Sequence, residues 1–95
     1  MGKAQLDAID REEKIMRFIY QFLNQHGCAP STMEIMRAAG LSSHKMIQAY
    51  CYELRRRGWI DWHEFATGRR VSRSIKITDK GLEVIQQLSV AVKHG

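Results

Sequence analysis

Four side chains between positions 45 and 52 are suited to reading the edges of nucleic-acid bases. They recur at the i, i+3, i+4 and i+7 spacing of one helix face, and none of them is acidic. A lysine donates to guanine or phosphate, a glutamine makes a two-point contact with adenine, and a methyl group or aromatic ring contacts the thymine methyl. The alternative interpretation is an ordinary solvated helix face. The candidate base-reading residues are Lys45, Gln48, Ala49 and Tyr52.

Positive charge is concentrated in the same part of the chain. The sequence has 15 lysine and arginine residues against 10 acidic residues, a formal net charge of +5. Residues 42–76 carry this whole excess, because basic and acidic side chains balance on either side of the segment. Such a local positive field neutralises phosphates and releases counterions, although many charge runs are only solvated surface. The residues expected to hold the nucleic-acid backbone are Ser43, His44, Arg55, Arg56, Arg69, Arg70 and Arg73, with Arg57 and Lys76 adding to the field.

A pair of short helices is expected to position these side chains. Ser31-Thr32-Met33-Glu34 has the form of a capping box, so a first helix is expected to begin at Thr32. Gly40 is expected to end it, because glycine adopts a left-handed turn at low cost. Ser42-Ser43 offers the next N-cap, and residues 44–57 follow as a helix without Gly or Pro. Together they form a helix-turn-helix unit, whose second helix can lie in a DNA major groove.

The segment before this unit is expected to supply a third core helix. Residues 1–9 are expected to form a flexible leader, and Asp10 is expected to cap a helix that ends near His26-Gly27. Apolar residues at helical spacing give this helix a broad stripe, which packs against the apolar side of the second helix of the pair. The side chains expected in this core are Ile15, Phe18, Ile19, Phe22, Leu23, Ile47, Tyr50, Cys51 and Leu54.

A β-hairpin is expected after Gly58. Residues 59–65 alternate in polarity and are rich in β-formers, residues 66–70 form a turn, and residues 71–77 return as a second strand. Ile60 is expected to face the core, with the two tryptophans on or near the opposite side. The wing, defined here as residues 64–73, is expected to carry its arginines to backbone phosphates or to an adjacent minor groove.

A last helix is expected over residues 78–92, capped by Thr78. It carries two apolar stripes, whereas a terminal helix on so small a domain needs only one for its own core. The second stripe is therefore expected to form a dimer seam, with a wide contact inside the chain as the alternative. The seam residues are Val84, Leu88 and Ala91.

The chain of 95 residues is expected to form one domain with one small core. The fold class is mainly α with a small β-hairpin: a winged helix-turn-helix with a three-helix core, a two- to three-stranded wing and an extra C-terminal helix. The sequence contains no 18-residue apolar run and no signal-type segment, which favours the cytoplasm. Its two cysteines are therefore expected to be reduced thiols.

Four motifs resemble the DNA-binding domain of LexA-type repressors over roughly residues 11–81. They are Ala29-Pro30-Ser31-x-x-Glu34-Ile35, Ala39-Gly40-Leu41-Ser42-Ser43, Leu54-x-x-x-Gly58-x-Ile60 and Arg73-Ser74-Ile75-Lys76-Ile77-Thr78. The resemblance implies a winged helix-turn-helix that binds an operator as a dimer, as prokaryotic or phage transcriptional repressors do. It also implies wing contacts near residues 68–73. The base contacts implied at matching positions are Ser43, Lys45, Met46, Gln48 and Ala49.

The chain also departs from the LexA-type pattern. LexA-type proteins continue into a Ser/Lys self-cleaving domain that dimerises them, and this sequence stops before any such segment. We therefore expect no self-cleavage, and we expect the last helix to provide dimerisation. The residues on the recognition face differ from the usual repressor set, so an SOS-type operator does not follow. The wing is also longer than the short loop of the family.

Three other functions are weighed. A catalytic site at Asp61, His63 and Glu64 is disfavoured, because successive side chains of a strand point to opposite faces. A metal site or other cofactor is not expected, because the histidines and cysteines are scattered and no pair has ligand spacing on one element. A protein-interaction module is the main alternative, since aromatic residues are enriched at interfaces. Its patch would consist of Trp59, Trp62 and Phe65, with Tyr52 beside them.

Overall fold

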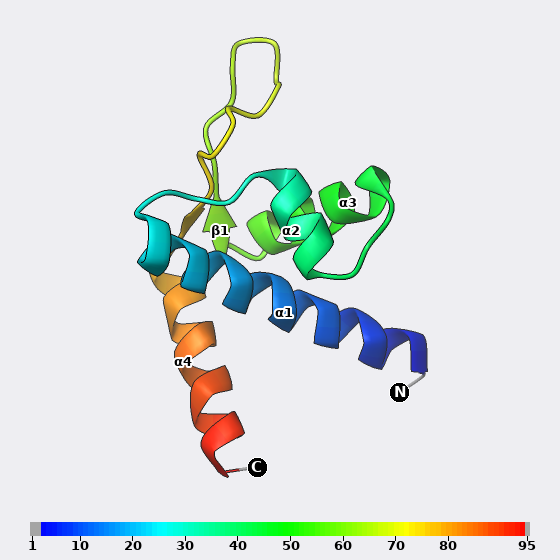
Figure 1. Ribbon diagram of the computed structural model, residues 1–95, viewed down its shortest axis with the longest axis vertical. Coiled ribbons are helices and arrows are strands. Elements are labelled where there is room, and N and C mark those ends of the chain that lie inside the picture. Colours follow the sequence, from blue (N-terminus) through cyan, green and yellow to red (C-terminus); the bar gives the residue numbers. More distant parts are fainter. Residues whose placement is uncertain (1–2, 95) are drawn as a thin grey trace.

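The protein is a mainly helical winged helix-turn-helix, as predicted. The computed structural model describes residues 3–94, with side-chain environments for residues 10–88. Helix α1 crosses the domain, α2 and α3 pack on one side of it, α4 runs away from its far end, and the wing projects beyond α2 and α3 (Figure 1). The elements in chain order are α1 (Lys3–His26), α2 (Thr32–Ala38), α3 (His44–Arg56), β1 (Ile60–Asp61), β2 (Lys76–Ile77) and α4 (Asp79–His94).

Helix α1 begins earlier than predicted. It starts at Lys3 instead of Asp10, so the expectation of a flexible leader over residues 1–9 is wrong for residues 3–9. The physical reason is that this segment contains no Gly or Pro and is rich in alanine, leucine and other good helix formers. Asp10 lies inside the helix, where its carboxylate pairs with the Lys14 ammonium at 3.4 Å, one turn along.

The helix-turn-helix unit forms as predicted. The backbone N–H of Ser31 donates to Glu34 Oε1 at 2.8 Å, and the backbone N–H of Glu34 donates to Ser31 Oγ at 3.2 Å, which completes the capping box at the start of α2. Gly40 turns the chain with a φ of 71°. Ser43 then caps α3, its Oγ accepting from the backbone N–H of Met46 at 3.4 Å. These caps fix where α3 begins and therefore which of its side chains face outward.

The core lies where α1, α2 and α3 meet. Tyr50, Phe18, Phe22 and Leu23, which were expected in the core, are only half-buried at its edge. Ile60 of the first strand and Ile85 of α4 complete the core, and burial of this apolar surface is the main force that holds the helices together. The largest fully buried side chains are Ile15, Met16, Ile19, Pro30, Ile35, Ile47, Cys51, Leu54 and Ile60.

The hairpin is present, but its strands are shorter than predicted. The two-stranded antiparallel sheet pairs Ile60 with Ile77 and Asp61 with Lys76, and beyond it the limbs meet at an isolated bridge between residues 64 and 70. The prediction that both tryptophans lie opposite Ile60 is wrong for Trp62, which is buried with 4% of its surface exposed. Side chains two residues apart in an extended chain share a face, so Trp62 follows Ile60 inward.

Helix α4 is capped by Thr78 as predicted, since Thr78 Oγ1 accepts from the backbone N–H of Gly81 at 3.1 Å. It runs to His94, slightly past its predicted end. Ile85 reaches the core, whereas Leu82 on the same helix is 37% exposed. Among the residues that the structure describes, no helix is both long enough and apolar enough to cross a bilayer.

Candidate nucleic-acid interface

The outer face of α3 is open to solvent along its whole length. Lys45, Gln48 and Ala49 are exposed, and Tyr52 is 55% exposed. The opposite face of the same helix is fully buried, so the two faces separate as the helical spacing predicted. The structure therefore brings the four candidate base-reading residues together on one accessible surface.

The first turn of α3 presents further candidate contacts. His44 is exposed, Met46 is 41% exposed, and Ser43 is half-buried because its hydroxyl caps the helix. Residues at the start of a recognition helix lie close to the DNA backbone and to base edges. Ser43, His44 and Met46 therefore continue the surface formed by Lys45 and its neighbours.

Tyr52 packs against Trp62 in the first limb of the hairpin. Its ring meets the edge of the Trp62 ring, with 5.3 Å between the centroids and an interplanar angle of 76°. Edge-to-face packing of this kind restrains both rings. Trp62 was not among the predicted site residues, but its separation of two residues from Ile60 was the signal that would have placed it inward beside α3.

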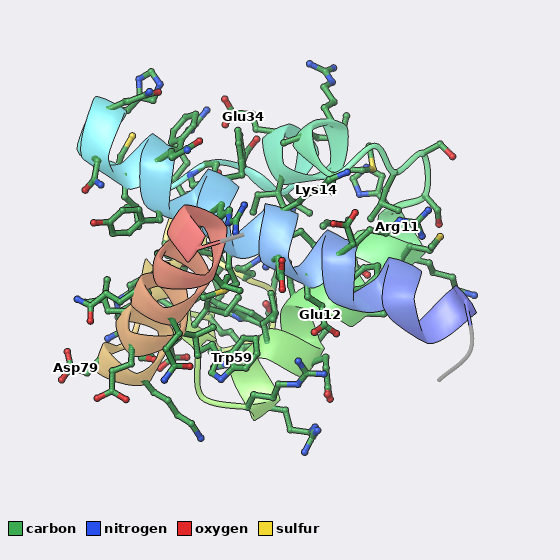
Figure 2. All side chains as sticks on the ribbon, turned by 90° about the horizontal axis from the view of Figure 1, so that it is seen from below. Arg11, Glu12, Lys14, Glu34, Trp59 and Asp79 are labelled. Atoms are coloured by element: carbon green, nitrogen blue, oxygen red, sulfur yellow. The ribbon has the colours of Figure 1, made fainter. Side chains whose placement is uncertain are left out.

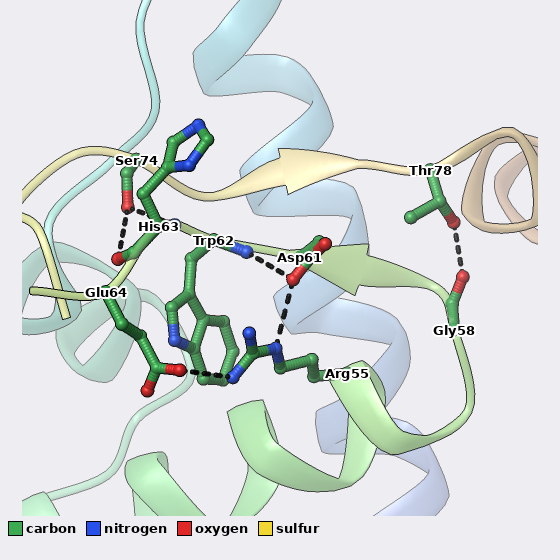
Figure 3. Close-up of polar contacts among 8 residues, drawn as sticks. All are labelled: Arg55, Gly58, Asp61, Trp62, His63, Glu64, Ser74 and Thr78. Atoms are coloured by element: carbon green, nitrogen blue, oxygen red, sulfur yellow. Dashed lines mark hydrogen bonds and ion pairs between the residues drawn. The ribbon is translucent and has the colours of Figure 1, made fainter. Parts of the chain in front are cut away.

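The three arginines at the end of α3 are engaged with carboxylates of the chain itself. Arg55 Nε lies 3.0 Å from Asp61 Oδ1 and Arg55 Nη1 lies 3.2 Å from Glu64 Oε1, while its guanidinium lies 4.4 Å from the centre of the Trp62 ring (Figure 3). Hydrogen bonds from the backbone N–H of Trp62 and then from Arg55 lower the pKa of Asp61. Two acids of the first hairpin limb therefore already pair with Arg55, and its contact with phosphate stays a prediction.

The next two arginines differ in exposure. Arg56, with 73% of its side chain exposed, pairs with Glu53 at 2.7 Å, and hydrogen bonds from Arg56 lower the pKa of Glu53. Arg57 pairs with Glu12 at 2.6 Å and with Glu53 at 3.8 Å, and its guanidinium lies over the Trp59 ring. Glu12 and Trp59 are labelled in Figure 2. Arg56 is thus the arginine of this run that remains at the surface, and Arg57 joins α3 to α1.

Two wing arginines also have partners within the chain. Arg70 donates from Nη2 to Thr32 Oγ1 and lies 4.8 Å from the centre of the Trp62 ring. Arg73 pairs with Glu34 at 2.9 Å. Both side chains turn back toward the start of α2, because hydrogen-bond acceptors there lie within their reach.

The remaining cations define a narrower positive surface than the sequence suggested. Arg69 is exposed at the wing tip, beside the turn in which the N–H of Gly68 donates to the carbonyl of Phe65 at 2.8 Å. Within residues 10–88, no ion pair joins Lys45, Arg69 or Lys76 to a carboxylate. These three side chains are exposed, and Arg56 is also exposed although it pairs with Glu53.

The structure also bears on the other functions weighed from the sequence. Trp62 is buried and Trp59 is half-buried, so the expected aromatic patch is reduced to Phe65 with Tyr52. Both cysteines are free thiols, and burial raises the pKa of the Cys51 thiol. Within the described part of the chain, no three histidine, cysteine or acidic residues gather as a metal site would require.

Comparison with known proteins gives a consistent result. The sequence matches the family model of the LexA DNA binding domain over residues 7–69, which takes in most of α1, the helix-turn-helix and the first limb of the wing. It is 35% identical over 81 residues to the LexA repressor of Leuconostoc mesenteroides, covering 82% of this chain and 37% of that repressor. It is 37% identical over 71 residues to the LexA repressor of Oenococcus oeni, covering 75% of this chain and 31% of that repressor. The chain thus spans about a third of the length of the curated relatives it matches.

Proposed function

Because the chain belongs to the LexA DNA-binding domain family, we propose that it binds double-stranded DNA sequence-specifically and represses transcription in a bacterial or phage setting. The observation that carries this proposal is the exposed, acid-free outer face of α3. That face lies directly opposite the buried face of the same helix, so the helix can enter a groove without disturbing the core. A DNA-binding role also places the protein in the cytoplasm.

In this proposal α3 lies in the major groove. Lys45 donates to guanine or phosphate, Gln48 makes the two-point contact with adenine, and Ala49 or the Tyr52 ring contacts a thymine methyl. Trp62 supports Tyr52 from behind, so that ring needs little ordering when it meets the base. Ser43, His44 and Met46 contribute from the first turn.

The wing, residues 64–73, lies on the backbone or the adjacent minor groove. Arg69 at its tip is the arginine of the wing that reaches outward, and Arg56 at the end of α3 approaches the same backbone. Phosphate contacts position a protein on the duplex without reading its sequence, so these two arginines supply affinity more than specificity. Arg55 contributes by holding the wing against α3.

We further propose that the protein acts as a homodimer through α4. Val84 and Leu88 are half-buried and line a hollow of about 210 Å³, whose other lining residues are Glu12, Glu13, Met16, Arg57 and Trp59. A second copy of α4 would fill this largely apolar hollow and bury the half-exposed stripe. The third seam residue, Ala91, has a side chain outside the described residues.

Light scattering at tens of micromolar tests the dimer. The parent protein is expected to show twice the mass of one chain, and Leu88→Lys is expected to show a single chain. Gln87→Lys adds the same charge at an exposed position of the same helix and should leave the dimer intact. A monomeric parent would rule the seam out.

Selection of bound sequences from a random duplex pool tests the DNA-binding proposal itself. Enrichment of one motif is expected, and affinity for that motif should fall steeply with salt, with a slope of about −0.9 for each phosphate contact. A pool that remains random, or binding that hardly responds to salt, would contradict the proposal and favour docking through exposed aromatic side chains.

A further inference from the structure

One residue of the wing adopts an unfavourable backbone conformation. Among residues 3–94, Arg73 is the only non-glycine residue with a positive φ, at 57°. The left-handed region is costly for a residue with a side chain, and within the same described residues glycine takes it at four other places, Gly68 of the same wing among them. A side chain persists in that region only when its surroundings hold it there, and such positions cluster where a structure must be set for function.

Contacts with the start of α2 hold Arg73 in place. Its Nη1 lies 2.9 Å from Glu34 Oε1 and donates to the carbonyl oxygen of Ala29 at 3.2 Å. Its guanidinium also lies 5.9 Å from the centre of the Phe22 ring. The partners therefore come from the end of α1, from the linker and from α2, all distant in sequence from the wing.

Glu34 has two roles at once. The same oxygen, Oε1, accepts the backbone N–H of Ser31 in the capping box and faces the Arg73 guanidinium. These contacts, led by the Ser31 backbone hydrogen bond, lower the pKa of Glu34. One carboxylate thus joins the cap that orients the helix-turn-helix to the limb that orients the wing.

A second contact runs parallel to the first. Arg70, on the same return limb, donates to Thr32 Oγ1 at the first residue of α2. Between the limb and α2 lies a hollow of about 250 Å³, lined by Pro30, Ser31, Thr32, Met33, Arg70, Val71, Ser72, Arg73 and Ile75. The limb is therefore held to α2 by arginine side chains that bridge a space, and loss of either bridge leaves it room to move.

We propose that Glu34 and Arg73 are positioning residues that fix the direction of the wing relative to the helix-turn-helix. Arg73 acts on DNA through the placement of the wing tip and Arg69, and makes no phosphate contact itself. The effect on DNA rests on the proposed function, whereas the effect on the wing can be measured on the protein alone.

The decisive variant is Glu34→Gln. Glutamine keeps the capping-box hydrogen bond but removes the charge that faces Arg73. If the pair positions the wing, affinity for the selected duplex should fall by about three- to tenfold, and the salt slope should stay the same because no phosphate contact is lost. If Arg73 instead binds phosphate directly, the variant releases it, so affinity should rise and the slope should steepen by about 0.9.

A matched control removes the general effect of charge. Glu83→Gln raises the net charge by the same amount at an exposed position of α4, away from the wing. Arg73→Gln should behave as Glu34→Gln does, and the double variant should be no weaker than either single one, because both changes break the same contact. Far-UV circular dichroism confirms that the helices remain in each variant.

Hydrogen exchange measures the wing without DNA. The amide of Phe65 bonds to the carbonyl of Arg69 at 2.7 Å, and the amide of Val71 bonds to the carbonyl of His63 at 2.8 Å. The protection factors of both amides should fall about tenfold in Glu34→Gln and Arg73→Gln. The protection factors of the core amides of α1 and α3 should stay unchanged. Arg73→Gly provides a second check, because it removes the backbone cost but also the contact, so the same amides should lose protection.

The outcomes separate the two proposals. Lost wing protection with an unchanged salt slope supports the positioning role. Unchanged protection, or a steeper slope in Glu34→Gln, overturns it. A parent protein that selects no duplex would overturn the proposed function, and the exchange measurements would still decide whether Glu34 and Arg73 hold the wing.

Discussion

The variant Arg57→Met tests whether an arginine in the basic segment binds DNA or stabilises the fold. Arg57 belongs to a run of three arginines at the end of the recognition helix. From its charge and position in the sequence alone, it would be expected to bind a DNA phosphate. In the structure its guanidinium makes hydrogen bonds of 2.6 and 3.2 Å to Glu12 and lies 5.0 Å from the centre of the Trp59 ring. The Glu12 side chain is only 12% exposed. Removing Arg57 therefore leaves a mostly buried carboxylate without its partner.

The expected cost follows from that burial. Breaking a fully buried ion pair by removing one partner costs about 3–5 kcal/mol. Here the Arg57 side chain is 33% exposed, so solvent screens part of the interaction, and methionine retains part of the packing on Trp59. We expect a loss of about 2 kcal/mol in the free energy of unfolding. For a domain of this size that lowers the melting temperature by about 10 °C.

Thermal unfolding followed by circular dichroism measures the loss, and a salt titration of DNA affinity below the lowered melting temperature measures phosphate contacts. Arg57→Met should leave the salt slope unchanged. Arg56→Met is the matched control in the same run. The Arg56 side chain is 73% exposed, so solvent screens its pair with Glu53 and the stability change should stay within about 0.5 kcal/mol. Loss of a phosphate contact should make the salt slope shallower by about 0.9. An Arg57 variant with an unchanged melting temperature and a shallower slope would refute this reasoning.

Three further predictions test the interface and the fold. Gln48→Ala should reduce the free energy of binding by about 1–3 kcal/mol on the selected duplex only, whereas Arg69→Ala should weaken binding to selected and random duplexes alike. Filter binding to both duplexes distinguishes the two variants. Equal losses on both duplexes for Gln48→Ala would contradict its assignment to base reading. Gly81→Ala should destabilise the protein by about 1–3 kcal/mol in urea unfolding, because a Cβ there would overlap the carbonyl oxygen of Trp59; no loss would contradict the close approach. Because the folded-state pKa of Asp61 is lowered from its ordinary value of 3.8, the stability it contributes is complete above that value and is lost as the pH falls through the lower folded value. Asp61→Asn should therefore show a smaller acid-induced loss in urea unfolding across that range, and an identical loss would argue against the pairing with Arg55.

The helix-turn-helix could be predicted from sequence because its signals are local. The capping box spans the four residues from Ser31 to Glu34, Gly40 marks the turn, and Ser43 caps the next helix, so each boundary is decided by neighbours along the chain. The inward and outward faces of α3 then follow from helical geometry alone. The start of α1 was missed because Asp10 is a good cap and also an acceptable interior residue, and local sequence does not decide between them.

The partners of the arginines could not be predicted in the same way. Arg57 and Glu12 are separated by 45 residues, and Arg70 and Thr32 by 38, so their contacts exist only once α1, α2 and the wing are packed. The burial of Trp62 also arises only from tertiary packing, because side chains of α3 cover the first limb of the hairpin. The spacing of residues in the sequence therefore located the outer face of α3, but it did not reveal that several neighbouring cations pair with carboxylates of the chain.

This difference changes how the positive segment should be understood. The excess of +5 in residues 42–76 was taken as one surface facing DNA, but Glu12 and Glu34 come from outside the segment and neutralise two of its arginines. What remains outward is a smaller set that includes Lys45 on α3 and Arg69 at the tip of the wing. A small set of phosphate contacts gives modest non-specific affinity, so discrimination between sequences must come mainly from the base-reading face and from how rigidly the wing is held beside it.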